Sequence, residues 1–161
     1  MVQAGHNAQP AEAAVASLVF RAGSLLCALP LDEVVETMRP LDVRPLAGTP
    51  PWVRGISIMR GVPAPVIDVA RLLTGEAGAV ARYVAVRTER GPVAFATGPV
   101  LGIRRVDADP AARHGVLLGA AAGALVAGVA TADGQPLLLL QSMRVVPDEV
   151  WAAAAGEAVA S

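Results

Sequence analysis

The sequence predicts an all-β protein in which most strands pair as antiparallel hairpins that close into barrels. Three observations lead to this prediction. Apolar stretches are repeatedly interrupted by glycine-containing turns. Apolar residues make up 54% of the chain and aromatic residues only 3%, so that the core must be built from Val, Leu, Ile and Ala. A chain of 161 residues is also long enough to bury most of its surface in one domain or in two small subdomains.

Four predicted hairpins follow one pattern, in which an apolar run, a glycine turn and a second apolar run succeed one another. The turns are Ala22-Gly23-Ser24 in LVFRAGSLLCAL, Arg60-Gly61 in ISIMRGVPAPVID, Arg90-Gly91 in YVAVRTERGPVAF and Asp133-Gly134 in GALVAGVATADGQPLLLL. Pro63 and Pro65 favour an edge strand or a bulge, because proline has no N–H to donate to a neighbouring strand.

Predicted helices are few and short. The segment LDEVVETM can form about two helical turns with Asp32 as a cap, although its two adjacent valines also permit a strand. The segment VARLLTG has the pattern of a short helix that ends at Gly75. A C-terminal helix is expected after Pro147, with acidic residues in its first turn and Trp151 as its anchor.

The remaining segments are interpreted as a tail, a connection and a strand. Residues 1–14 are small and polar, which is typical of a disordered tail and not of a signal peptide. Residues 76–82 are interpreted as a connection between two halves of the chain. Residues 115–132 are uncharged and near the lower length limit of a membrane helix, but the turn at Asp133-Gly134 favours a strand that pairs with the next apolar run.

Composition argues against a nucleic-acid or membrane-surface protein. Thirteen basic and fourteen acidic residues give a net charge of -1, which provides no field to attract DNA, RNA or an anionic bilayer. The only cysteine, Cys27, lies in the apolar stretch LLCALP and is interpreted as a small core residue. With no possible internal disulfide, a reducing, cytoplasmic compartment is expected.

Chemistry-bearing motifs are sparse. The two histidines, His6 and His114, have no cysteine or carboxylate pair at metal-binding spacing beside them. The stretch GISIM lacks the closing glycine of a serine-nucleophile elbow, and a chain without lysine cannot contain a phosphate-binding loop of the Walker type. We therefore expect a binding protein without catalytic activity, cofactor or metal.

The stretch WVRGISIMRGVPAPVIDV at residues 52–69 resembles the signature segment of the CheW coupling proteins of bacterial chemotaxis. The matching positions are Trp52, Val53, Arg54, Gly55, Met59, Arg60, Gly61, Pro65, Val66, Ile67 and Asp68. Upstream, LVFRAGSLLCALPLDEVVETM resembles the opening hairpin of the family, followed by a segment that carries Val34 and Glu36. The resemblance extends over residues 16 to 146.

The resemblance implies two five-stranded SH3-like β-barrel subdomains that pack together, with a few short helices and a C-terminal helix. On this interpretation, residues 1–14 are the tail, 15–150 a CheW-like domain of two intertwined barrels, and 151–161 the end of the helix and a short tail. The implied function is a cytoplasmic adaptor recruited to receptor arrays at the inner face of the membrane. Its partners would be a CheA-type histidine kinase and the signalling tips of methyl-accepting chemotaxis receptors, with no nucleic acid and no membrane insertion.

The resemblance also implies which residues carry binding. The receptor-binding residues are expected to be Val34, Glu36, Arg54, Arg60, Val84 and Val86, although Val34 and Val84 equally fit plain core positions. The kinase-binding residues are expected in the second-half barrel at Leu101, Ile103 and Val106. The positions with a structural role in the signature are Gly55, Gly61, Pro65 and Asp68.

Arg60 has two interpretations. We hypothesise that its fork-shaped guanidinium pairs bidentately with Glu36 at the seam between the barrels, while Gly55 and Gly61 let the strand bend at its ends. On composition alone, Arg60 would instead be a solvated turn residue without a partner.

Three departures from the family pattern leave other functions open. Ile58 replaces the expected asparagine, Thr97-Gly98 replaces a Val-Asp pair, and Gln141 stands where an aspartate or asparagine is usual. The chain is therefore also compatible with a divergent CheW-like module that serves another pathway, or with a module that binds a small ligand between its barrels.

Overall fold

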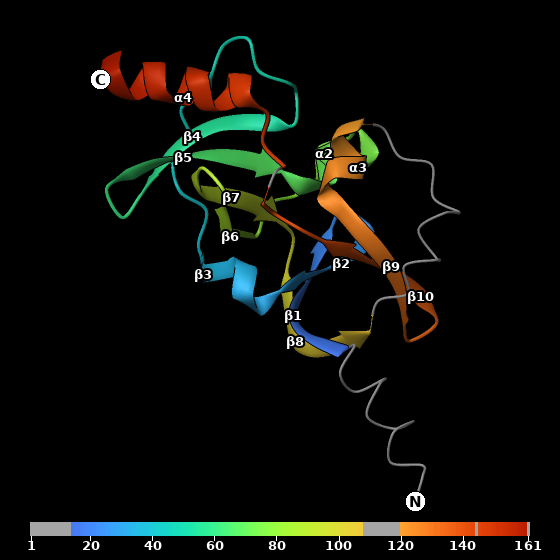
Figure 1. Ribbon diagram of the computed structural model, residues 1–161. Coiled ribbons are helices and arrows are strands. Elements are labelled where there is room, and N and C mark those ends of the chain that lie inside the picture. The colour runs from blue at the N-terminus through green and yellow to red at the C-terminus, as the bar shows by residue number, and fades with distance from the viewer. Residues whose placement is uncertain (1–13, 108–119, 144, 161) are drawn as a thin grey trace, which may run out of the picture.

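Two five-stranded sheets form the protein in the computed structural model, which describes residues 14–107, 120–143 and 145–160 (Figure 1). The expected N-terminal tail, except its last residue, and both histidines lie outside the described residues. No helix in the described part of the chain is long and apolar enough to cross a bilayer.

The first sheet combines strands from both ends of the chain in the order β8-β1-β2-β10-β9. Its strands are β1 (Ala14–Ala22), β2 (Leu25–Pro30), β8 (Val100–Asp107), β9 (Val126–Ala132) and β10 (Gln135–Leu140). The second sheet has the order β3-β6-β7-β5-β4. Its strands are β3 (Val34–Met38), β4 (Val53–Met59), β5 (Val62–Asp68), β6 (Arg82–Thr88) and β7 (Gly91–Thr97). The N-terminal hairpin therefore joins the C-terminal one, as Figure 1 shows.

All four predicted hairpins are confirmed: β1–β2, β4–β5, β6–β7 and β9–β10 each pair antiparallel across a two-residue turn. Positive φ angles at both turn residues identify the Arg60-Gly61 and Asp133-Gly134 turns as type I′. Such turns match the right-handed twist of the strands that they join. The parallel pairs β2–β10 and β5–β7 then assemble the hairpins into sheets.

The two prolines lie in a strand with neighbours on both sides, which differs from the expected edge strand. Strand β5 lies between β4 and β7, but its ladder with β7 covers only Val66 to Asp68. Pro63 and Pro65 precede this ladder and oppose Ile58 and Ile56 of β4. Within β5 they therefore occupy the part that has only one partner strand, where a missing N–H is tolerated.

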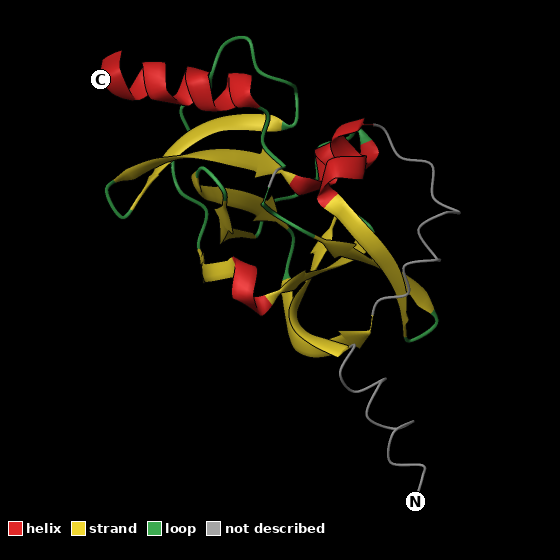
Figure 2. Cartoon of the chain, in the orientation of Figure 1, coloured by secondary structure: helices red, strands yellow, loops and turns green. Residues whose placement is uncertain are grey.

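Helices are short, as Figure 2 shows, and two of them differ from the sequence prediction. The expected two-turn helix at residues 31–38 is wrong, because only Leu31–Glu33 forms a 3-10 turn, η1, before the chain enters β3. The predicted short helix is confirmed as α2 (Val69–Thr74), which ends at a left-handed Gly75. The C-terminal helix is confirmed as α4 (Asp148–Ala160). Helix α3 (Ala120–Leu125) was not expected, because an Ala-rich stretch without caps gives no boundary signal.

Two expectations about the connections change as well. Residues 76–82 do not separate two halves, because they join β5 and α2 to β6 within the second sheet. The chain passes between the sheets at η1 and after β7, and after β10 it leaves the first sheet for α4. Of the apolar segment 115–132, residues 120–132 form α3 and β9, which supports the strand interpretation in its second half.

Three groups of buried residues form the core. The largest lies between the sheets and includes Phe20 and Leu29 of the first sheet and Phe95 of the second. A second group, around Tyr83 and Met59, consists of buried residues from strands of the second sheet only. A third group, around Leu137 and the mostly buried Val106, consists of buried residues from strands of the first sheet. Each sheet thus curves around a small core of its own, and the main core between them holds both together.

Candidate functional site

The hypothesised pair of Arg60 and Glu36 is present. Arg60 Nε donates to Glu36 Oε2 at 2.6 Å, and Arg60 Nη2 donates to Oε1 at 2.7 Å, so that the guanidinium meets the carboxylate as a two-pronged fork. The Arg60 side chain is 79% exposed and that of Glu36 is 27% exposed. The interpretation of Arg60 as a solvated turn residue without a partner is therefore wrong. The pair is nevertheless a surface contact.

The location of this pair differs from the expected seam between the barrels. Glu36 belongs to β3 and Arg60 to the β4–β5 turn, and β3 and β4 are the two edges of the second sheet. The pair therefore joins the open edges of one curved sheet. It forms a side-chain contact between edges that no backbone ladder joins.

Arg60 adopts a backbone conformation that is unfavourable for a side chain. Its φ angle is 51°, in the left-handed region that glycine and asparagine occupy more readily, and it precedes Gly61 at 80°. A strained residue at an exposed turn often reflects a functional requirement for its side chain. Here the requirement that we can identify is the fork to Glu36.

The contact between Arg60 and Glu36 shifts the pKa of both side chains toward their charged forms. The hydrogen bond from Arg60 lowers the pKa of Glu36, with partial desolvation acting in the opposite direction and the charge of Arg60 adding to the decrease. The same carboxylate raises the pKa of Arg60, mainly through the hydrogen bond. Both side chains are therefore charged at neutral pH.

Gly55 has a different role from the expected bend at a strand end. It lies inside β4 at a bulge and has a φ angle of 140°. A Cβ atom there would lie 2.0 Å from the carbonyl oxygen of Arg44. Arg44 approaches this closely because it pairs with Ile56 through two 2.8 Å backbone hydrogen bonds. Gly55 thus lets the loop after β3 add a rung to the edge strand β4.

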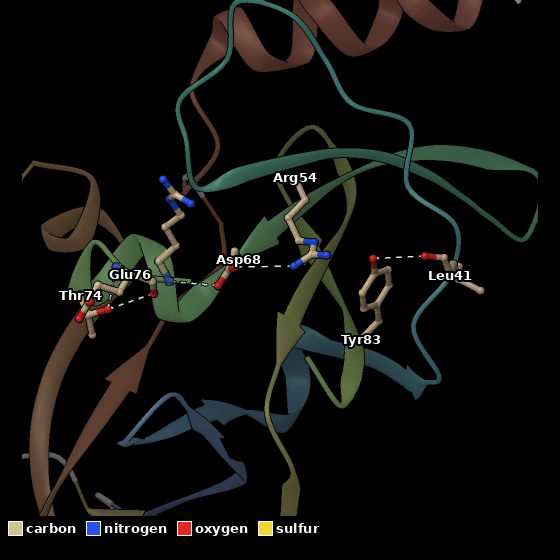
Figure 3. A network of polar contacts seen from close by, with 7 residues as sticks. Leu41, Arg54, Asp68, Thr74, Glu76 and Tyr83 are labelled. Carbon is tan, nitrogen blue, oxygen red and sulfur yellow. Dashed lines mark hydrogen bonds and ion pairs between the residues drawn. The ribbon is translucent and has the colours of Figure 1, made fainter. Parts of the chain in front are cut away.

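Asp68 and Arg54 meet at the opposite end of the β4–β5 hairpin (Figure 3). Asp68 is buried and accepts a 3.0 Å hydrogen bond from Arg71 N, which caps helix α2. Its second oxygen lies 3.7 Å from Arg54 Nη1. Nearby, the Tyr83 hydroxyl donates to Leu41 O at 3.3 Å, and burial raises the pKa of Tyr83.

The two ion pairs of the hairpin are too far apart to form one small site. Arg54 and Arg60 are six residues apart along an extended strand, which separates their Cα atoms by roughly 20 Å at about 3.3 Å per residue. Arg60 and Glu36 therefore form one group, and Arg54 belongs with Asp68 in another.

Three valines proposed for receptor binding divide into two kinds. Val84 and Val86 are completely buried in the main core, so that their side chains shape the sheet from within and cannot themselves touch a partner. Val34 is partly exposed and lies opposite Val86 on the edge strand β3. Of these three valines, only Val34 therefore offers surface near Glu36.

The residues proposed for kinase binding lie on β8, at an edge of the first sheet. Leu101 is 48% exposed and Ile103 is 62% exposed, which makes them an apolar patch on an open strand. Val106 faces the core of the first sheet and is buried. Arg104 and Arg105 border the patch, where Arg104 lies 3.4 Å from Asp133 and Arg105 donates to Ala14 O.

A groove beside β4 was not expected from the sequence. Its volume is about 650 Å³, and it is lined by Asp42, Val43, Arg44, Pro45, Ile56, Ser57, Ile58 and Pro63. Ile58, one of the departures from the family pattern, is 58% exposed. The replacement of the family's asparagine by Ile58 was the one signal in the sequence, whereas residues 42–45 gave none. The lining belongs to the second sheet, and the space between the sheets is filled by the main core.

The other two departures lie where the chain leaves a sheet. Thr97 is buried at the end of β7, and Gly98 donates to Arg21 O of β1 at 2.8 Å. Gln141 follows β10, and its N–H donates to Leu125 O while its side-chain amide donates to Ala124 O. Both positions hydrogen-bond segments that leave a sheet, and neither belongs to the exposed surfaces described above.

Comparison with known proteins now identifies the family. A model of the CheW-like domain matches residues 16–150, which includes both sheets. The chain belongs to the CheW-like domain family. Among curated proteins, it is 36% identical to Protein FrzA of Myxococcus xanthus over 98 residues. That alignment covers 54% of this chain and 56% of FrzA, so the chain spans little more than half the length of this relative.

A solved structure of the family has the same fold. The scaffolding protein TtCheW from Thermoanaerobacter tengcongensis superimposes with a TM-score of 0.70. The match covers 82% of this chain and 92% of TtCheW, at 19% sequence identity. The two curved sheets of the present chain are therefore SH3-like subdomains with the same fold as this structure.

Proposed function

We propose that this protein is a non-catalytic adaptor that couples methyl-accepting chemotaxis receptors to a CheA-type histidine kinase in bacterial two-component signal transduction. The observation that carries the proposal is the presence of two different exposed surfaces on two different sheets. One is the charged Glu36–Arg60 fork, and the other is the apolar patch of Leu101 and Ile103. Membership of the CheW-like family supports the same function.

The receptor surface is centred on Glu36 and Arg60, with Val34 beside them on β3. A charged fork on an exposed turn suits a partner with polar groups at its tip, because rim charges set orientation and register more than raw affinity. Arg54 would contribute from the far end of the hairpin only to a partner that extends about 20 Å along β4. Val84 and Val86 keep the strands of this surface in place.

The kinase surface is centred on Leu101 and Ile103 of β8. An apolar patch with charged neighbours has the composition of an interface core with a polar rim. Val106 anchors the strand in the core of the first sheet. A partner that covers this patch would also protect an open sheet edge, which is otherwise prone to aggregation.

The mechanism of such an adaptor is geometric. Binding the receptor on one sheet and the kinase on the other raises the effective concentration of each partner for the other. No phosphate needs to pass through the adaptor. A change in receptor state reaches the kinase only if the two sheets keep a defined orientation, which makes the adaptor a coupling element. In the cell, we expect recruitment to receptor arrays at the inner face of the membrane.

The experiment that tests this function is a calorimetric titration of the full chain with each partner separately. The partners are a receptor signalling-tip fragment and a CheA-type regulatory domain from the same genome. We expect Arg60→Ala to weaken receptor binding only and Ile103→Glu to weaken kinase binding only. Arg90→Ala is the matched control, because it removes another exposed Arg–carboxylate pair, that with Asp148.

The outcomes of this titration are distinct. If the folded wild-type chain binds neither partner, the adaptor function is wrong, and a divergent module of another pathway becomes the better interpretation. If each variant weakens both partners equally, the assignment of the two surfaces is wrong.

A further inference from the structure

A buried hydrogen-bonded junction connects the two sheets at Ser142, outside the surfaces proposed for binding. Ser142 follows β10 at the point where the chain leaves the first sheet, and it is completely buried. Its N–H and its hydroxyl approach Glu33 Oε1 at 2.7 Å and 2.9 Å. Glu33 ends η1, where the chain crosses from β2 of the first sheet to β3 of the second.

The junction also includes β6, the neighbour of the edge strand β3 in the second sheet. Ser142 Oγ lies 2.7 Å from Arg87 O on β6. Arg87 in turn donates from Nη1 to Asp32 O of η1 at 2.6 Å. Two residues after Arg87 and one residue after Ser142, Glu89 N donates to Met143 O at 3.1 Å. The crossing between the sheets at η1, the segment that leaves the first sheet after β10, and one strand of the second sheet therefore meet around a single buried hydroxyl.

The hydroxyl of Ser142 can keep its contacts in only one relative position of η1 and β6. A serine hydroxyl carries one proton, whereas the carboxylate of Glu33 and the carbonyl of Arg87 are both acceptors. Both acceptors lie within hydrogen-bond distance of Oγ only while η1 and β6 hold their present positions relative to Ser142. A buried polar group of this kind is costly when it loses its partners, so that alternative sheet orientations are disfavoured.

We propose that Ser142 is a positioning residue that fixes the orientation of the two sheets and thereby couples the receptor surface to the kinase surface. This inference rests on the proposed function, because it assigns the two partner surfaces to different sheets. Ser142 touches neither surface. Its effect is expected in the coupling between partners and not in the binding of either one alone.

The test uses Ser142→Ala in the full chain, with Ser17→Ala as the matched control. Ser17 is also a buried serine, but its hydroxyl donates to Val15 O within the same strand and connects no sheets. Nitroxide labels at Thr37→Cys on β3 and Thr131→Cys on β9 report the distance between the sheets by pulsed electron paramagnetic resonance. Cys27 is buried and does not interfere with labelling.

Ser142→Ala is expected to shift or broaden the distance distribution between the labels, whereas Ser17→Ala leaves it unchanged. We expect calorimetric affinities for each partner alone to stay within about twofold of wild type, the effect of losing a few tenths of a kcal/mol. The increase in affinity for one partner caused by the other is expected to fall roughly fivefold or more, in the range of measured couplings between sites.

Either an unchanged distance distribution or a changed distribution with intact coupling overturns the proposal. If Ser142→Ala does not fold, Glu33→Ala removes the shared acceptor from a partly exposed residue and is judged by the same measurements. If the wild-type chain binds neither partner, the proposed function fails. The label distances then still decide whether the junction orients the sheets.

Discussion

At the scale of single residues, Arg60 combines an unfavourable backbone conformation with a favourable side-chain contact. A glycine would adopt the φ angle of 51° more easily, but only the guanidinium can reach both oxygens of Glu36. Because the pair is exposed, its main effect is expected on recognition and not on folding. The resemblance to the CheW family predicted this pair, whereas composition alone favoured an unpaired arginine.

The pKa of Glu36 tests the ion pair directly. Arg60→Ala removes the hydrogen bond and the charge that lower this pKa, so we expect it to rise toward the ordinary glutamate range. Because the folded-state pKa is depressed, the pair stabilises the protein above the unfolded-state pKa, and this contribution is lost as the pH falls through the folded-state value. A carboxyl NMR titration of wild type and variant measures the change. An unaltered Glu36 pKa in the variant would contradict the contact.

Cys27 is expected to be unreactive in the folded protein. Burial raises the pKa of its thiol to about 12, so that almost no thiolate exists at pH 8, and the side chain has no exposed surface. An alkylating reagent should therefore label Cys27 only at the rate at which the protein opens. Mass spectrometry with and without denaturant measures both rates. Rapid alkylation of the native chain would show that this part of the core is not closed.

At the scale of elements, the β4–β5 hairpin carries Arg60 in its turn, and its two glycines, Gly55 and Gly61, have different structural roles. Gly61 supplies a positive φ in the turn, with nothing within 4 Å of an added Cβ. Gly55 also has a positive φ, but an added Cβ would collide with the backbone of Arg44. The sequence predicted the turn glycine correctly because the local pattern is sufficient for a hairpin. It could not predict the second role, which depends on a loop eleven residues away in the chain.

Paired alanine substitutions separate the two roles. Gly61→Ala is expected to lower the free energy of unfolding by roughly 1–2 kcal/mol, the cost of a left-handed conformation. Gly55→Ala is expected to cost more than about 3 kcal/mol, because backbone strain and a backbone collision add. Urea unfolding of both variants measures the difference. Equal losses would show that the loop at Arg44 moves away without cost.

Because Val84 is buried and Ile103 is exposed, alanine substitutions at these positions are expected to change the free energy of unfolding by different amounts. Val84→Ala removes two buried methyl groups from the main core and should cost about 2 kcal/mol. Ile103→Ala changes a mostly exposed side chain and should stay within about 0.5 kcal/mol of wild type. Chemical denaturation provides both values. A destabilised Ile103 variant would indicate that β8 is covered in the isolated protein.

At the scale of the whole molecule, the two sheets are assembled from strands that are distant in sequence. Hairpins could be predicted because alternating apolar runs and glycine turns are local signals. The assignment of β6 and β7 to the second sheet, and of β8 to the first, depends on long-range pairing and was not predictable from those signals. The same holds for the junction of Glu33 and Ser142, which are 109 residues apart.

The whole-molecule arrangement is compatible with the proposed binding of two partners by one domain. The charged fork lies on the second sheet and the apolar patch on an edge of the first, with the main core between the sheets. A partner on one surface therefore leaves the other accessible. An adaptor must hold both partners at the same time. The proposed function is therefore tested by formation of the complex of receptor, adaptor and kinase, more than by binding of either partner alone.

The most direct test is whether the protein recruits the kinase to the receptor. Receptor signalling domains displayed on vesicles are sedimented with a CheA-type kinase, in the presence and absence of the full chain. We expect the kinase to sediment with the vesicles only when the chain is present. Arg60→Ala and Ile103→Glu are each expected to abolish this co-sedimentation of the kinase. Kinase sedimentation that is independent of the chain, or unchanged by both substitutions, would contradict the account.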